Sequence, residues 1–120
     1  MEVVRQASKS FRDLIVWQKA HELVLGVYHK TQSFPKEEAY ALTSQIRRSS
    51  MSVAANIAEG FKKKGPRDKV KFYNIAQGSL SETEYFLLLS QDLKYGDMKE
   101  LMSKADEVGR ILNAYIKTIK

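Results

Sequence analysis

No cysteine occurs anywhere in the 120 residues of this chain. This absence excludes disulfide bonds, thiolate metal sites and cysteine nucleophiles, and it fits a reducing cytosol. Long apolar runs are also missing, because the longest clusters, such as Tyr85–Leu89, are far shorter than the ~20 residues that cross a bilayer. The first ten residues turn polar after Val3 and Val4, unlike a secretory signal. We therefore expect a cytoplasmic protein with no membrane partner.

Motifs that would carry chemistry are equally scarce. The sequence has no Gly-x-Ser-x-Gly elbow, no glycine-rich phosphate loop and no Glu-x-x-His motif of the kind that di-iron bundles use. Its two histidines, His21 and His29, lie about two helical turns apart, whereas imidazole pairs that bind zinc usually lie four residues apart. We expect no metal, no cofactor and no enzymatic activity.

The composition is that of a folded domain. Hydrophobic residues make up 43% of the chain and charged residues 28%, close to the averages for soluble globular proteins. A chain of this length can bury about two thirds of the surface that it exposes when unfolded. We expect residues 1–10 to form a flexible leader and residues 11–120 to form one domain.

The two prolines and the glycines near them divide the domain into four helical stretches. Apolar residues recur in each stretch at spacings of three and four, and no segment alternates as a strand would. The first predicted helix runs from a cap at Asp13 to about Thr31, and the second begins between Lys36 and Leu42 and ends at Gly60. The third runs from beyond Pro66 to about Tyr95, and the fourth begins with a cap at Asp97. Short connections make neighbouring helices antiparallel, so the fold class is all-α, an up-down-up-down four-helix bundle.

Polar residues interrupt the apolar second and third helices. They are Gln45, Arg48, Asn56 and Glu59 on the second helix and Gln77, Ser79 and Glu82 on the third. Across the hairpin, Asn56 and Glu59 are placed to face Ser79 or Glu82. Two paired carboxylates would have pKa values that are pushed apart, which suits a general acid and base. We favour the alternative, a hydrogen-bonded network that fixes helix register or subunit geometry.

Positive charge is concentrated at the turn between these two helices. The formal net charge is +6, and six cations between Lys62 and Lys71 are opposed only by Asp68. The candidate nucleic-acid-binding residues are Arg47, Arg48, Lys62, Lys63, Lys64, Arg67, Lys69 and Lys71. Such side chains neutralise phosphates without reading sequence, and the nearby aromatics Phe61, Phe72 and Tyr73 are candidates for stacking on unpaired bases. The alternatives are a solvated turn that aids solubility, an arginine pair that binds acids, and aromatics that belong to the core.

Several short motifs together resemble a known family. They are LIVWQKA at residues 14–20, Phe34-Pro35 followed by Glu38, QIRRSS at 45–50, SVAANIAEG at 52–60, and AQGSL at 76–80 with Glu82. The sequence is similar to the four-helix-bundle proteins encoded in intervening sequences of bacterial 23S ribosomal RNA genes. The match runs from about Phe11 to Tyr95, with a looser fourth helix, and the Asn-Ile-Ala-Glu-Gly block is its most specific part.

This resemblance implies a homo-oligomer, a cyclic pentamer, similar to accessory proteins of diversity-generating retroelements that are thought to engage nucleic acid and a polymerase. It associates no enzymatic activity with the family. The matching positions, for which it implies an architectural role, are Gln45, Arg47, Arg48, Asn56, Glu59, Gly60, Gly78, Ser79 and Glu82. The turn departs from the family pattern, because lysines at 62–64 replace a more usual arginine-containing sequence and lack its bidentate fork for phosphate.

Two functions follow as hypotheses. The first is a basic oligomeric module that binds RNA, other nucleic acid or a ribonucleoprotein partner through its positive turns. The second is a protein-interaction scaffold, in which the small residues of the second helix form the oligomer and the charge only aids solubility. A carboxylate hydrolase using Glu59 and Glu82 is a third, weaker hypothesis.

Overall fold

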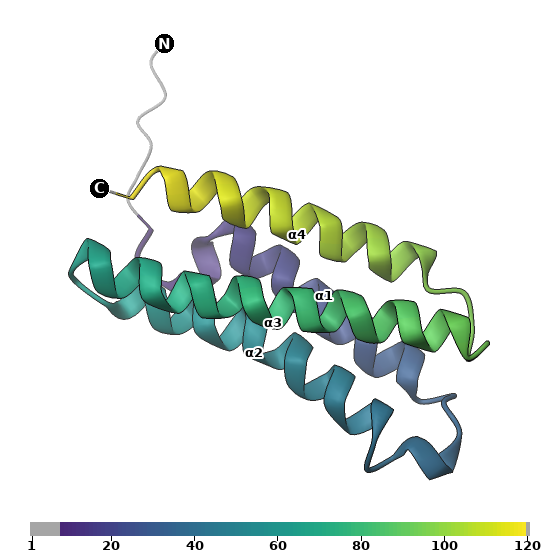
Figure 1. The fold of residues 1–120 in the computed structure, drawn as a ribbon. Helices are drawn as coiled ribbons and strands as arrows, with labels where there is room; N and C mark the ends of the chain where they lie inside the picture. Colours follow the sequence, from purple (N-terminus) through teal and green to yellow (C-terminus); the bar gives the residue numbers. More distant parts are fainter. Residues whose placement is uncertain (1–7, 120) are drawn as a thin grey trace.

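The computed structural model describes residues 8–119, and these form a bundle of four long helices. The long helices are α1 (Ile15–Thr31), α2 (Leu42–Lys62), α3 (Pro66–Asp92) and α4 (Lys99–Lys117), with short 3-10 turns η1 (Phe11–Asp13) and η2 (Lys36–Glu38). Successive helices run antiparallel, and α4 packs back against α1 (Figure 1). The predicted fold class is therefore confirmed, and residues 8–119 contain no strand.

Apolar stripes at helical spacing form the core between the helices, as predicted. On α2 the stripe is Leu42, Ile46, Ser49, Val53 and Ile57, all of them buried. On α3 the inner face is formed by Tyr73, Ala76, Leu80, Thr83 and Leu87, and on α4 by Leu101, Ala105, Val108 and Leu112. No helix in the described part of the chain is long and apolar enough to span a membrane.

The start of α1 differs from the prediction. Asp13 is not its N-cap: the Asp13 carboxylate accepts hydrogen bonds from the backbone N–H groups of Lys9 and Ser10, and Ser10 caps η1 in return. The prediction failed because this reciprocal pair, a capping box, serves the preceding 3-10 turn. The leader predicted for residues 1–10 lies mostly outside the described residues, and Ser10 is already part of the fold.

Gly60 does not end α2, as we predicted; the helix continues to Lys62. Instead Gly60 is buried against Tyr73, where a Cβ atom would lie 2.6 Å from the ring carbon Cε1. The missing side chain thus allows α2 and α3 to approach closely where they meet. At the far end α3 ends at Asp92 rather than near Tyr95, and Gly96, with φ of 139°, lies in the loop to α4.

The predicted cap of α4 is displaced by one residue. The N-cap position is Met98, although the Asp97 carboxylate does accept a hydrogen bond from the N–H of Lys99 at 3.0 Å. Met98 is completely buried and anchors this loop in the core. Burial of Met98 therefore determines where the helix begins, and the aspartate stabilises its first turn from outside.

Candidate nucleic-acid interface

The turn between α2 and α3 forms the most basic part of the molecule. Lys62 ends α2, Lys63 to Gly65 form the connection, and Pro66 begins α3, where its fixed φ suits the first helical position. Lys62, Lys64, Arg67 and Lys71 are exposed, and none of them forms an ion pair with a described residue. These four cations are therefore available to an external anion.

Two lysines of the predicted set have partners within the chain. Lys69 Nζ donates hydrogen bonds to the backbone carbonyls of Phe61, at 2.8 Å, and Gly60, at 3.3 Å, and so satisfies the C-terminal end of α2. Lys63 Nζ lies 3.7 Å from the carboxylate of Glu59. Lys69 is thus a helix-capping residue, and the structure gives it a stabilising role that sequence spacing did not indicate.

The aromatic residues at this turn are less open than the sequence suggested. Tyr73 is fully buried, which confirms the core alternative for this residue, and burial together with neighbouring Tyr115 raises the pKa of its hydroxyl. Phe61 and Phe72 are half-buried, and ammonium groups lie over both rings: Lys69 over Phe61 at 5.5 Å and Lys63 over Phe72 at 5.0 Å. A base would have to displace these lysines to stack there.

Arg47 and Arg48 lie far from the turn and are engaged in packing. Arg47 is half-buried; its Nε donates to Thr31 Oγ1 at 2.8 Å and its guanidinium lies 4.5 Å from the ring centre of Tyr28. Arg48 binds the Glu82 carboxylate at 2.6 Å. The structure therefore supports the architectural alternative for this pair, with Arg47 joining α1 to α2 and Arg48 joining α2 to α3.

The polar network between α2 and α3 exists, but with different pairings. Ser49 and Thr83 share a hydrogen bond of 2.8 Å, and Ser52 and Ser79 share one of 2.7 Å. Asn56 donates to the backbone carbonyl of Ser52 on its own helix, at 2.8 Å, rather than across the hairpin. Gln45 accepts a hydrogen bond from Arg48 Nε at 2.9 Å. Small hydroxyl side chains thus connect the two helices along their shared face.

The carboxylate pair considered for a hydrolase does not form. Glu82 on α3 binds Arg48 on α2. Glu59 lies near Lys63 and is eleven residues, about 16 Å, further along α2 than Arg48. Both acids are about half exposed, with 52% of the Glu59 and 46% of the Glu82 side chain accessible. Two separated, solvated carboxylates cannot act together as a general acid and base on one bond, so this interpretation was wrong. Within residues 8–119 no three His, Asp or Glu side chains gather as a metal site.

The fold brings further cations to the same end of the bundle. Lys9 and Arg12 precede α1, and Lys117 ends α4; both helix ends lie beside the α2–α3 turn (Figure 1). Lys9 and Lys62 line one surface depression together with Phe11, Ala55 and Glu59. We call this surface the basic end: Lys9, Arg12, Lys62, Lys63, Lys64, Arg67, Lys71 and Lys117. The first two and the last were missed because only the up-down topology brings them close.

Comparison with known protein families shows to which family this four-helix chain belongs. Residues 12–114 match the model of the 23S rRNA-intervening sequence protein family. The chain belongs to this family. A solved structure from the S23 ribosomal protein family of Bacteroides thetaiotaomicron, described as a protein with unknown function, superposes with a TM-score of 0.79. It is 25% identical in sequence, and the alignment covers 86% of this chain and 99% of the other.

No curated protein matches this member of the 23S rRNA-intervening sequence protein family. The family match extends beyond Tyr95, where the motif resemblance weakened, and includes nearly all of α4. The comparisons thus establish the family and the fold, and the function has to be argued from the surface.

Proposed function

We propose that this protein is a non-enzymatic, oligomeric module that binds RNA in the cytoplasm through its basic end. The observation that carries the proposal is the gathering of exposed cations from η1, the α2–α3 turn and α4 on one end of the bundle. Clustered lysines and arginines bind a nucleic-acid backbone by neutralising phosphates and releasing counterions. The name of the family, taken from a ribosomal RNA gene, agrees with this class of partner.

The opposite end of the bundle has a different charge pattern, so positive charge is distributed unevenly along the molecule. There the loops and helix ends carry Glu37, Glu38, Asp92, Asp97 and Glu100 among their lysines. Mixed charge of this kind keeps a surface soluble without attracting a polyanion. Polarised charge steers a negatively charged partner towards one end, and the attraction falls as salt rises. A phosphate backbone would therefore meet the basic end first.

Self-association would multiply this weak attraction. Met51 on α2 and Ile75 and Tyr85 on α3 expose 44%, 43% and 57% of their surface, and Ala55 is exposed one helical turn from Met51. We propose that copies of the chain associate through these exposed apolar side chains of α2 and α3, with the pentamer of the family resemblance as the expected state. Each additional basic end would then bind at a high effective concentration, so that several weak contacts give useful affinity.

The test is a fluorescence-anisotropy titration of labelled single-stranded RNA, structured RNA and duplex DNA at ~50 and ~200 mM salt, a range over which several phosphate contacts cost orders of magnitude in affinity. The variant Lys62→Gln/Lys64→Gln/Lys71→Gln removes three exposed cations from the basic end. Its matched control, Lys36→Gln/Lys94→Gln/Lys99→Gln, removes the same charge from exposed lysines at the other end. Lys69 is left in place because it caps α2.

We expect the wild-type protein and the control to bind RNA with a similar, steep salt dependence. The basic-end variant should bind more weakly, and its slope of log K against log salt should be shallower by about two, because three phosphate contacts are lost. Equal loss in both variants would mean that net charge alone drives binding. No binding by the wild-type protein at ~50 mM salt would reject the proposal and favour the protein-interaction scaffold.

A further inference from the structure

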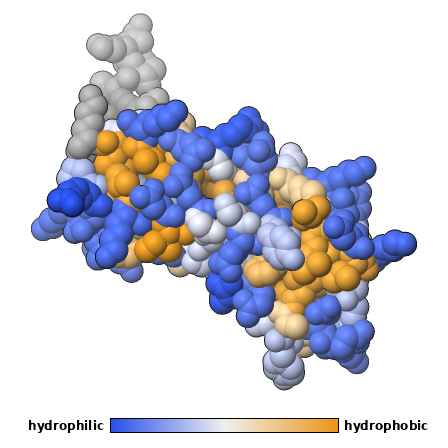
Figure 2. Space-filling view, viewed as in Figure 1, coloured by the Kyte–Doolittle hydropathy of each residue, from blue (hydrophilic) through white to orange (hydrophobic). Residues whose placement is uncertain are grey.

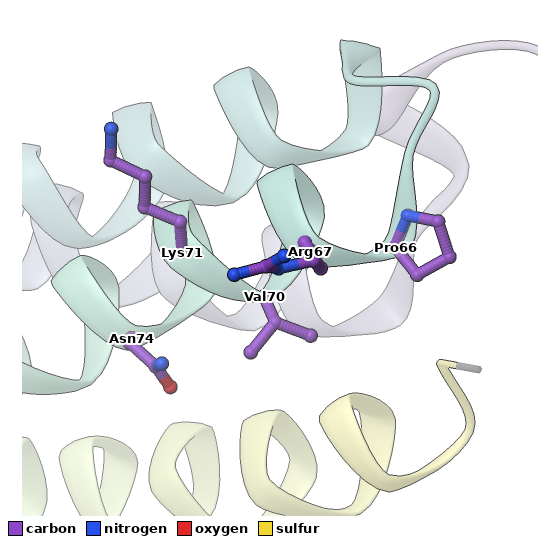
Figure 3. A pocket seen from close by; sticks show the side chains of 5 residues that line it. All are labelled: Pro66, Arg67, Val70, Lys71 and Asn74. Carbon is purple, nitrogen blue, oxygen red and sulfur yellow. The ribbon is translucent and has the colours of Figure 1, made fainter.

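We propose that the basic end binds single-stranded RNA and holds one unpaired base in a depression on α3. This inference rests on the proposed function and specifies the form of RNA that the protein takes. The depression is lined by Pro66, Arg67, Val70, Lys71 and Asn74, all from the first turns of α3 (Figure 3). Its volume is about 520 Å³, and it is shallow and open to solvent.

The lining has separate apolar and charged sides. Val70 and Asn74 point towards α4, whereas the ammonium group of Lys71 points away from it (Figure 3). Pro66 and Val70 provide an apolar wall, and no acidic side chain is among the residues that line the depression. Figure 2 shows an apolar area at this end, over the start of α3 and the end of α4, with hydrophilic residues around it. A flat apolar base fits such a wall and leaves its sugar and phosphate on the charged side.

The polar groups around the depression suit the other parts of a nucleotide. Arg67 and Lys71 are exposed and one helical turn apart, at about 5–6 Å between Cβ atoms, so they can contact adjacent phosphates. Asn74 is exposed and its side chain has no hydrogen-bond partner among residues 8–119. An amide both donates and accepts, which allows it to pair with a base edge. Groups that can bind phosphate, Arg67 and Lys71, and a group that can bind a base edge, Asn74, thus lie within two turns of α3.

Duplex nucleic acid does not fit this arrangement equally well. In a duplex the bases are stacked and paired, so neither a flat face nor a free pairing edge reaches a shallow surface depression. The aromatic faces at the turn, which would be the usual stacking platforms, are covered by Lys63 and Lys69, and Lys71 Nζ lies 5.9 Å from the ring centre of Phe72. The half-buried side chain of Val70 provides apolar surface in the depression, beside Arg67 and Lys71. Unpaired RNA is therefore the form that gains contacts beyond its phosphates.

The experiment compares three RNA ligands of equal length: a single strand, the same strand with abasic residues in its central positions, and a duplex. The abasic strand keeps every phosphate, so it separates base contacts from charge. We expect the intact strand to bind roughly tenfold more tightly than the abasic strand, the size of one stacked base. Two variants test the lining of the depression: Asn74→Leu keeps the volume and removes the amide, and Val70→Thr keeps the shape and adds a hydroxyl. Each should reduce the preference for the intact strand over the abasic strand without changing the salt dependence of binding.

The outcomes separate this inference from the function on which it rests. Equal, salt-sensitive binding of intact and abasic strands would overturn the base site and leave the RNA-binding proposal standing. Duplex binding as tight as single-strand binding would overturn it as well. Loss of preference in Asn74→Leu, with a wild-type melting temperature and wild-type affinity for the abasic strand, would support it. Absence of binding to all three ligands would reject both proposals.

Discussion

Gly60 has a structural role that depends on the hydrogen in place of a side chain. An added Cβ would lie 2.6 Å from Cε1 and 3.0 Å from Cδ1 and Cζ of Tyr73, whose ring is completely buried. Overpacking of this kind typically costs about 1–3 kcal/mol, whereas replacing a helical glycine by alanine gains up to about 1 kcal/mol in helix propensity. We expect Gly60→Ala to lower the free energy of unfolding by about 1–2 kcal/mol in urea denaturation followed by circular dichroism.

Gly78 provides the matched control for this prediction. It lies in the interior of α3, is exposed, and has no atom within 4 Å of the position that a Cβ would occupy. Gly78→Ala should therefore raise the free energy of unfolding by about 0.5–1 kcal/mol through helix propensity alone. If Gly60→Ala were as stabilising as Gly78→Ala, close approach at Tyr73 would not be the reason for the glycine.

Single residues also mark the limit of prediction from the sequence. The sequence identified Gly60 as important but predicted a helix stop, because a glycine near a turn commonly ends a helix. That Gly60 instead meets Tyr73 depends on the distance between α2 and α3, which no local signal contains. Arg47 is similar: its charge suggested phosphate binding, and only the packing of α1 on α2 shows that Thr31 and Tyr28 engage it.

Hydroxyl side chains form hydrogen bonds between the elements α2 and α3. Ser49 and Thr83 are completely buried and share a hydrogen bond of 2.8 Å. One hydroxyl donates to the other, and the accepting hydroxyl donates its own proton to a carbonyl of its helix, Ile46 for Ser49 or Ser79 for Thr83. Thr83→Val keeps the shape and removes the pair, so it should cost about 0.5–1.5 kcal/mol of stability. Ser49→Ala should cost a similar amount, and it leaves a small cavity where the hydroxyl was.

The double variant Ser49→Ala/Thr83→Val isolates the interaction. Because the two hydroxyl groups bind each other, we expect the double variant to lose less stability than the sum of the single variants, a coupling that a double-mutant cycle measures. Ser81→Ala on the exposed face of α3 is the control and should change stability by less than about 0.5 kcal/mol. Strict additivity of the two core changes would show that the hydroxyl pair does not link the helices.

Helix number, order and inner faces were predictable because each depends on a repeating local pattern. Periodic apolar residues identified the inner stripes of α2, α3 and α4, and short connections indicated the antiparallel order. Helix ends were less predictable. Ser10 and Asp13 cap η1 rather than α1, and buried Met98 moves the start of α4 by one residue. Asp13 and Asp97 do accept hydrogen bonds from the backbone, but Asp13 completes a capping box on η1, and Met98 rather than Asp97 occupies the N-cap position of α4.

At the scale of the whole molecule, the basic end could be predicted only in part. The cations between Lys62 and Lys71 are adjacent in sequence and were found there. Lys9, Arg12 and Lys117 belong to the same surface only because an up-down bundle places the starts of α1 and α3 beside the ends of α2 and α4 (Figure 1). Surface charge therefore becomes interpretable after the topology is known, and an RNA contact would extend over three segments of the chain.

Assembly and RNA binding are linked if the protein acts through several basic ends at once. Ala55 is exposed on α2 beside Met51, so Ala55→Tyr adds neutral bulk to the proposed contact between copies without disturbing the core. We expect this variant to elute as a smaller species in size-exclusion chromatography with light scattering, and to keep the wild-type helical content. Ala114→Tyr makes the same change at an exposed position of α4 and should leave the mass unchanged.

The smaller species should also bind RNA more weakly, although every cation of the basic end is still present. Loss of multivalency commonly reduces avidity by 10²–10⁴-fold, so at ~50 mM salt the anisotropy titration should show a drop of about a hundredfold or more for a long single strand. A short RNA that reaches only one basic end should bind both species equally. Weaker binding of the short RNA to the variant would mean that the new tyrosine, which shares a depression with Lys9 and Lys62, disturbs the basic end itself. If Ala55→Tyr dissociated the oligomer and bound long RNA as tightly as the wild-type protein, avidity would not contribute. If the wild-type protein were monomeric at the highest concentration tested, the proposed contact face would be wrong.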